Sequence, residues 1–264
     1  MALKCRMRLL EPSEWQGFNK FGISPGILMS NAKLLIINFE GESTAGLTEI
    51  DPLTAKLQAT VAAIMEMDSS QALDKNHADG AVRTVNTIGV NENNEPVNRT
   101  EEMHATDGTI IKDTTNLYMD LWHLFGNLWG NGDLDAEGDV DISKGDATLI
   151  GRIAATANEG QGSGFKVPIG WRAAMLYGSI NAVGAQAADE GKKIRLLYVD
   201  DVDVLNDVRS INYIDLEIYG AVRRLETCHV QIFDAGTEIT FFIVRSDDGN
   251  EDFIAQFQFL LWKV

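Results

Sequence analysis

Residues 164–180 constrain the fold more than any other stretch, because they carry the pattern of a strand, a tight turn and a second strand. Pro168 fixes its own φ angle and has no backbone N–H, so a strand must stop or bend there. Gly170 can adopt the positive φ that such a turn often needs. Trp171 and Tyr177 then supply bulky side chains that pack well on a half-buried sheet. The sequence therefore predicts a β-rich protein whose later strands return to this corner.

Alternating apolar residues follow this corner. Residues 192–199 predict a strand, and the shorter runs 216–219 and 228–233 predict two more. Residues 237–245 and 253–262 predict a hairpin around the polar turn 246–251. In its second strand the apolar face is formed by Phe253, Ala255, Phe257, Phe259 and Leu261. We therefore expect residues 139–264 to form a C-terminal β-sandwich domain.

The first half of the chain carries weaker signals. Residues 32–39 predict a buried strand, and residues 82–90 and 100–111 predict a hairpin around the Asn-rich turn 91–96. Asp51 and Pro52 are typical of a helix start, so we expect one short helix over residues 52–66. Residues 117–129 fit a helix and a strand equally well by periodicity.

Glycines and acidic residues concentrate at positions 126–138, which predicts a domain boundary there. We accordingly expect an N-terminal β domain over residues 32–130. Residues 1–31 are expected to form an irregular N-terminal arm, anchored by Trp15, Phe18 and Phe21. The predicted fold class is thus mainly β, with two β-sandwich (jelly-roll-like) domains, the arm and one short helix.

The arm is expected to act in assembly. Its three aromatic residues belong to no periodic element that would bury them, and leaving each in water would forgo roughly 1.5–3 kcal/mol. We therefore expect the arm to pack across a neighbouring subunit or another protein.

The chain is strongly acidic, with 22 Lys and Arg against 39 Asp and Glu and a formal charge of -17. Such a surface repels phosphate backbones, and the pairs Lys192–Lys193 and Arg223–Arg224 are isolated, so we expect no direct nucleic-acid binding. Residues 1–10 have no continuous apolar core of a signal peptide, and no apolar run reaches the ~20 residues of a membrane helix. We expect a protein that is made in a cytoplasm and does not enter membranes.

Two short motifs suggest chemistry that their surroundings do not support. Residues 198–201 (YVDD) resemble the metal-binding hairpin of reverse transcriptases, but a polymerase needs a third carboxylate and a cationic template channel. Residues 158–164 (NEGQGSG) are glycine-rich, yet a phosphate loop must open a helix, and here a strand with a proline follows. We interpret both stretches as structural.

Residues 133–141 alternate acidic residues with a glycine, as calcium loops do. Lys144 stands where such a loop needs a bidentate glutamate, and no pair of helices flanks it. We therefore expect this loop to be structural.

No catalytic, cofactor-binding or metal-binding residues are predicted. The four histidines lack metal-ligand spacing, and no serine sits in a nucleophile elbow. Cys5 and Cys228 are expected to be buried free thiols. The histidines considered are His77, His104, His123 and His229. We expect no enzyme and no cofactor.

A series of short segments, taken in order, resembles a family of virion structural proteins found in tailed phages of aquatic bacteria and in some large algal viruses. The resemblance spans about residues 80–264 and depends on the order and spacing of turn motifs. Trp171 departs from the pattern, in which lysine is usual. The segments are residues 80–85 (GAVRTV), 88–93 (IGVNEN), 100–101 (TE), 106–109 (TDGT), 138–142 (GDVDI), 158–163 (NEGQGS), 167–171 (VPIGW) and 234–239 (DAGTEI).

The resemblance implies a structural component of a virus particle, such as a capsid decoration (cement) protein or a minor capsid protein. It favours a strand over residues 117–129, and it implies self-assembly, with a trimer as the first guess, and contacts with other virion proteins. The alternative is a receptor- or carbohydrate-binding β-sandwich of a phage tail or fibre. In that alternative Trp122, Trp129 and Trp171 would form an exposed sugar platform.

Overall fold

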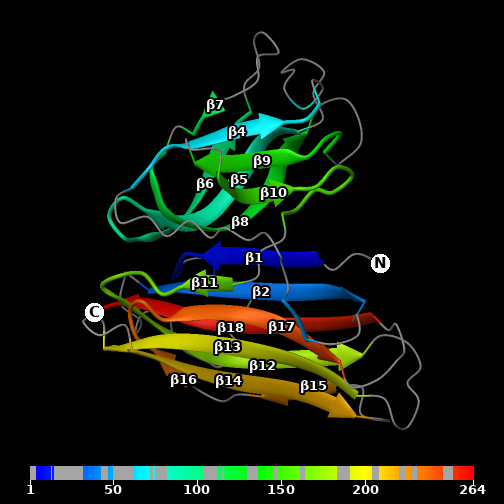
Figure 1. Ribbon diagram of the computed structural model, residues 1–264, viewed down its shortest axis with the longest axis vertical. Helices are drawn as coiled ribbons and strands as arrows, with labels where there is room; N and C mark the ends of the chain where they lie inside the picture. The colour runs from blue at the N-terminus through cyan, green and yellow to red at the C-terminus, as the bar shows by residue number, and fades with distance from the viewer. Residues whose placement is uncertain are drawn as a thin grey trace. The chain divides into compact units, whose positions relative to one another are not determined.

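The computed structural model shows a mainly β chain that splits into two compact units (Figure 1). Unit 1 consists of Met1–Ile50 and Ser163–Val264, and unit 2 consists of Asp51–Gly162. No helix in the described part of the chain has the length and apolar character needed to cross a membrane. The residues described are 4–12, 14, 32–42, 47–49, 62–71, 74, 82–103, 112–114, 116–129, 136–144, 148–160, 164–182, 191–203, 208–219, 224–227, 231–245 and 252–264.

The first sheet of unit 1, here called sheet A, is antiparallel and contains both the first and the last described strands. Its strand order is β1-β2-β18-β12-β15, and β16 also pairs with β12. The C-terminal strand β18 therefore lies in the middle of the sheet, between β2 and β12. The strands are β1 (Lys4–Leu10), β2 (Ala32–Glu42), β12 (Trp171–Ala182), β15 (Arg224–Thr227), β16 (Gln231–Phe233) and β18 (Asp252–Lys263).

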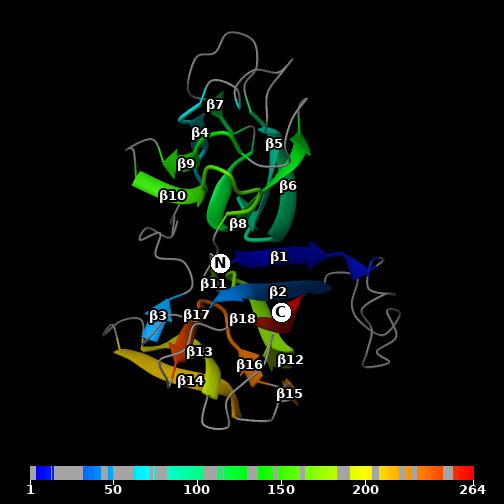
Figure 2. The same cartoon turned by 90° about the vertical axis from the view of Figure 1, so that its right-hand side faces the viewer.

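The second sheet of unit 1, sheet B, is also antiparallel, with the order β11-β17-β13-β14 and with β3 paired to β17 (Figure 2). Its strands are β3 (Leu47–Glu49), β11 (Gly164–Lys166), β13 (Gly191–Asp203), β14 (Val208–Tyr219) and β17 (Glu238–Arg245).

Aromatic rings from the two sheets meet in the core of unit 1. The ring of Phe39 in sheet A lies 4.9 Å from that of Phe241 in sheet B, measured between centroids. Phe165 of sheet B and Phe259 of sheet A make an edge-on contact at 5.0 Å. Buried aromatic side chains contribute much of the hydrophobic free energy of a core, and tilted pairs add to it. Sheets A and B therefore pack face to face.

Unit 2 is inserted in the chain between β3 and β11, two short strands that together occupy one position in sheet B. Strand β13 pairs along the whole of β17, so β3 and β11 share the other edge of β17. Glu49 at the end of β3 is opposite Phe242, and Gly164 at the start of β11 is opposite Thr240. The two ends of the insertion are therefore two residues apart along β17.

Unit 2 has a four-stranded sheet of order β10-β9-β4-β7 and a three-stranded sheet of order β6-β5-β8. One cluster of buried residues, including Met65, Val85, Tyr118 and Ile142, joins strands of both sheets. The strands are β4 (Met65–Ser69), β5 (Val82–Asn91), β6 (Pro96–Glu102), β7 (Lys112–Asp113), β8 (Tyr118–Trp129), β9 (Val140–Lys144) and β10 (Thr148–Ile153).

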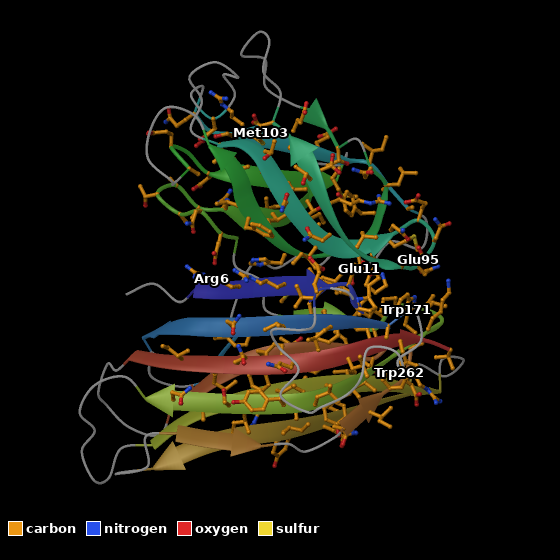
Figure 3. All side chains as sticks on the ribbon, turned by 180° about the vertical axis from the view of Figure 1, so that it is seen from behind. Arg6, Glu11, Glu95, Met103, Trp171 and Trp262 are labelled. Atoms are coloured by element: carbon orange, nitrogen blue, oxygen red, sulfur yellow. The ribbon has the colours of Figure 1, made fainter. Side chains whose placement is uncertain are left out.

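The corner at residues 164–180 is a strand, a turn and a strand, as the sequence predicts. Gly170 has φ +80°, and its carbonyl accepts a hydrogen bond from the N–H of Val264 at 2.9 Å. Trp171 is buried, and it lies at the same end of unit 1 as Trp262 (Figure 3). The two strands enter different sheets, β11 in sheet B and β12 in sheet A. The corner thus connects the two layers.

Several local predictions are confirmed. The buried strand at residues 32–39 is part of β2, and all but the first of residues 117–129 form strand β8 (Tyr118–Trp129). The hairpin predicted around residues 91–96 is the β5–β6 pair, but its second strand is Pro96–Glu102 and so begins within the predicted turn and not at residue 100. Its turn is held by the Asn91 side chain, whose Oδ1 accepts hydrogen bonds at 2.9 Å from the N–H groups of Asn93 and Glu95.

The predicted domain ranges differ from the units of the structure. Residues 32–42 were expected in an N-terminal domain over 32–130, but as β2 they pair with β18 at the C-terminus. Residues 139–160 were expected in the C-terminal domain over 139–264, but they belong to unit 2. Pairing of strands far apart in sequence leaves no local signal, so composition at residues 126–138 gave the wrong boundary.

Three other expectations need correction. The arm over residues 1–31 was expected to be irregular, but residues 4–10 form strand β1, with buried Met7 and Leu9. Trp15, Phe18 and Phe21 lie outside the described residues. The end of the predicted helix over residues 52–66 is extended, since Ala63 forms a bridge and β4 starts at Met65; residues 52–61 are not among those described. Strands β17 and β18 do not form a hairpin, because they lie in different sheets.

Removing unit 2 should leave unit 1 folded. In a variant that joins Ile50 directly to Gly164, β3 and β11 would run as one strand along β17, with Ile50 opposite Phe241. We expect a β-type circular dichroism spectrum and one cooperative thermal transition. The control joins Ile50 to Val167 and so also loses β11, which should lower the melting temperature. Absence of a cooperative transition in the first variant would show that unit 1 needs the insertion.

Two neighbouring phenylalanines test the aromatic core of unit 1. Phe241 is fully buried between the sheets, whereas Phe242 points to the opposite face of β17 and is partly exposed. Phe241→Ala should lower the free energy of unfolding of unit 1 by about 3–5 kcal/mol, and Phe242→Ala should lower it clearly less. Urea titration would measure both. Equal losses would contradict a core that is centred on Phe241.

Candidate functional site

The motif at residues 198–201 is part of the fold of unit 1. Tyr198 lies on β13, and its ring packs edge-on against Phe233 of sheet A at 5.1 Å. The side chains of Asp200 and Asp201 are outside the described part. Among the described residues, no group of histidine, cysteine and acidic side chains could hold a metal ion. Tyr198 therefore contributes to the core.

The acidic loop over residues 133–141 is held in unit 2 by the buried carboxylate of Asp74, which was not predicted from the sequence. The Oδ2 atom of Asp74 accepts hydrogen bonds from the Ser69 hydroxyl at 2.6 Å and from the N–H of Gly138 at 2.9 Å. Its Oδ1 accepts from the N–H of Glu137 at 3.1 Å. A buried carboxylate needs such donors to offset its lost hydration. Asp74 thus fixes residues 137 and 138.

Two carboxylates of the same loop pair with an arginine. The Nη2 atom of Arg152 donates to Asp141 at 2.7 Å, and Arg152 Nη1 lies 3.3 Å from an oxygen of Asp139. The acidic side chains thus form ion pairs with Arg152, which links β9 to β10. Residues 133–135 lie outside the described part, so it stays a prediction that this loop is structural and not a calcium site.

The glycine-rich stretch 158–164 pairs with strands. Glu159 and Gly160 form single bridges with Phe125 and Ile153, and the N–H of Gly160 donates to the Leu124 carbonyl at 2.7 Å. A Cβ atom on Gly160 would lie 2.9 Å from the carbonyl oxygen of Arg152. The described part of this stretch thus needs glycine for close backbone approach.

His123 on β8 is buried, and its Nδ1 atom has no hydrogen-bond partner. Burial lowers the pKa of His123 to about 3, because the interior disfavours the charged imidazolium. His77, His104 and His229 fall outside the described residues.

A second buried carboxylate, Glu101, sits in a polar cluster of unit 2. Its Oε1 atom accepts hydrogen bonds from the Tyr118 hydroxyl and from the Asn116 amide, both at 2.7 Å. The Tyr118 oxygen also lies 2.6 Å from the Thr87 hydroxyl. Burial and the neighbouring carboxylate raise the pKa of Tyr118, so it remains a neutral donor. The cluster fixes β5, β6 and β8 to one another.

The tryptophans of the sugar-platform alternative are largely inside the protein. Trp171 and Trp122 are buried, and the Trp122 indole N–H donates to Asp120 at 2.8 Å. The side chain of Trp129 is not among those described. Two of the three residues therefore cannot offer an exposed face to a sugar.

The most exposed apolar pair on one described strand belongs to β14. Ile211 is 68% exposed and Tyr213 is 60% exposed, whereas Leu216, on the opposite face of the strand, is buried. Among the described strands, β14 is the last of sheet B, and Figures 1 and 2 both show it at the margin of that sheet. Exposed apolar side chains on an outer strand are typical of an association site.

The charged side chains next to Ile211 and Tyr213 form an ion pair with each other. Arg195 on β13 makes two hydrogen bonds to the Asp215 carboxylate, at 2.8 and 3.0 Å. Its guanidinium lies over the Tyr213 ring, 4.2 Å from the centroid, in a cation–π contact. The surface formed by Ile211, Tyr213, Arg195 and Asp215, here called the β14 surface, thus combines exposed apolar groups with a closed ion pair. Of this strand, only residues 216–219 were predicted from the sequence.

Comparisons with known proteins leave the family open. No family model matches the chain, and no curated protein matches it. Among solved structures, the vicilin from Solanum melongena aligns over 95% of this chain and 79% of its own length, with 8% identity and a TM-score of 0.15. A TM-score this low carries no argument about fold or function.

His123 should make the stability of the protein depend on pH. Its pKa is about 3 when folded and about 6.5 when unfolded, so between these values only the unfolded chain binds the proton. The free energy of unfolding should therefore fall as the pH drops below about 6.5. From pH 7.5 to 5.5 the loss attributable to His123 should be about 1.4 kcal/mol.

The measurement is urea unfolding at both pH values for the wild type and for His123→Leu. The other histidines remain in both proteins, so the difference between the two pH dependences isolates His123. Identical pH dependences would show that His123 is not held neutral by burial.

Proposed function

We propose that this protein is a structural component of a virus particle that acts by assembling with copies of itself and with other virion proteins. The proposed location is the capsid, as a decoration protein or a minor capsid protein. The observation that carries the proposal is the β14 surface, where Ile211 and Tyr213 are exposed side by side on an outer strand. An exposed apolar pair of this kind is suited to protein–protein contact.

The segments that resemble virion structural proteins supply the second support. Several lie at turns or strand starts where the backbone has special requirements. Gly170 in the segment 167–171 and Gly236 in the segment 234–239 have φ angles of +80° and +88°. Residues 138–142 lead into β9. The resemblance thus includes positions at which the fold restricts the choice of residue.

The proposed architecture is a jelly-roll-like sandwich for unit 1 and a second, smaller sandwich for unit 2. In support, each unit has two antiparallel sheets, and those of unit 1 face each other through aromatic rings. Sandwiches of this type are common in particle shells because their broad faces and edges offer several contact surfaces.

The proposal is tested by quantitative mass spectrometry of purified particles. We expect the protein to remain with intact particles through density-gradient purification, in a fixed ratio to the major shell protein. A fixed ratio is expected because closed symmetry sets the number of equivalent positions.

An isotopically labelled copy of the protein, added to the lysate before purification, is the control for adventitious adhesion. It should not accumulate on particles whose positions are already filled. Loss of the unlabelled protein from the particle fraction, or equal recovery of both forms, would contradict a structural role.

A further inference from the structure

We propose that β14 is the strand through which two copies of this chain associate, by antiparallel pairing of β14 with its equivalent about a two-fold axis at Asn212. This inference rests on the proposed function, since it names one of the contacts through which the protein would assemble. The pairing would join two copies of sheet B into one continuous sheet.

The first support is the position of β14 in sheet B. Strand β14 is twelve residues long and pairs with β13 on one side through a nearly unbroken antiparallel register. Within the described strands, the order β11-β17-β13-β14 ends there. The backbone groups of an outer strand can pair with another chain, and natural sheets usually block this with charges or proline. Here Ile211 and Tyr213 stand exposed instead.

The second support is that the exposed pair is complementary to itself. In antiparallel pairing centred on Asn212, two residues are opposite each other when their residue numbers sum to 424, twice 212. Ile211 is then opposite Tyr213 of the second copy, and Tyr213 is opposite its Ile211. Pairs of an aromatic and a β-branched residue are among the favourable cross-strand combinations. One symmetry operation would therefore form the contact between Ile211 and Tyr213 twice.

Charge complementarity favours a second copy of this chain as the partner of β14. The same register places position 209, an arginine, opposite position 215, an aspartate, at both ends of the contact, where Asp215 would keep its pair with Arg195 of its own chain and gain a second positive neighbour. Opposite charges at facing positions stabilise a strand pair, whereas like charges destabilise it. A chain with a formal charge of -17 repels its copies at long range, so a contact between copies needs such local compensation. The proposed register provides it.

On the other described strands of unit 1, exposed apolar residues do not form a comparable pair. Ile232 on β16 is 55% exposed and Ile254 on β18 is 42% exposed, but they lie on separate strands of sheet A. Among the described strands, β14 alone has two apolar residues more than half exposed at alternating positions. Ile232 is therefore a suitable position for a matched control.

Sedimentation velocity of the purified full-length chain over a range of concentrations gives the first test. We expect a concentration-dependent dimer for the wild type and for the control Ile232→Lys. Ile211→Lys and Tyr213→Glu should each weaken dimerisation at least tenfold while the monomer keeps one cooperative thermal transition, because both side chains are exposed. A monomeric wild type, or equal weakening by Ile232→Lys, would overturn the proposal.

Mixing the two variants tests the register itself. In a mixed pair, the lysine introduced by Ile211→Lys is opposite the glutamate introduced by Tyr213→Glu, and the other contact retains its native Tyr213 and Ile211. We therefore expect the mixture to form heterodimers at concentrations where each variant alone is monomeric, and 0.5 M salt should weaken them. No association in the mixture would overturn the proposed register.

The two proposals can fail separately. A chain that is monomeric in solution but stays with particles in a fixed ratio would refute the β14 pairing and leave the virion role intact. A chain that dimerises through β14 but is absent from particles would refute the virion role and leave the pairing intact.

Discussion

The interaction on which unit 1 depends is the packing of phenylalanine rings between sheets A and B. Phe39, Phe257 and Phe259 come from sheet A, and Phe165 and Phe241 come from sheet B. These residues are far apart in sequence, so the cluster forms only when β2, β11, β17 and β18 have all reached their places. The cluster therefore stabilises the strand order as well as the contact between layers. One face of β14 is exposed to solvent because the other face of sheet B packs against sheet A in this core.

Local patterns were enough to predict individual strands but not their pairing. The apolar run of residues 32–39 and the alternation after residue 192 identify strands because burial imposes a period of two. The hairpin at residues 91–96 was predictable because its signal lies within six residues. In contrast, the polar segment 246–251 looks like a hairpin turn, yet β17 and β18 enter different layers. The choice between a hairpin and a crossing between sheets is made by the ring cluster, which no local window contains.

The candidate site was harder to predict, for a related reason. Strand β14 carries apolar residues on both faces, Ile211 and Tyr213 outward and Ile214 and Leu216 on the other face, so no alternation marks which side is exposed. The sequence also gives no sign that Arg195 and Asp215 form a pair, because they meet only through the β13–β14 register. The buried carboxylates Asp74 and Glu101 were missed because an acidic residue in an acidic chain looks like a surface residue.

The central place of β18 in sheet A has a consequence for biosynthesis. Strand β18 joins β2 to β12 but follows both in sequence, so sheet A cannot close until β18 has left the ribosome. Unit 2 is continuous in sequence and can fold well before that moment. A chain that terminates before β18 would thus carry a folded unit 2 and two unpaired strand edges in unit 1, a state that chaperones and proteases recognise.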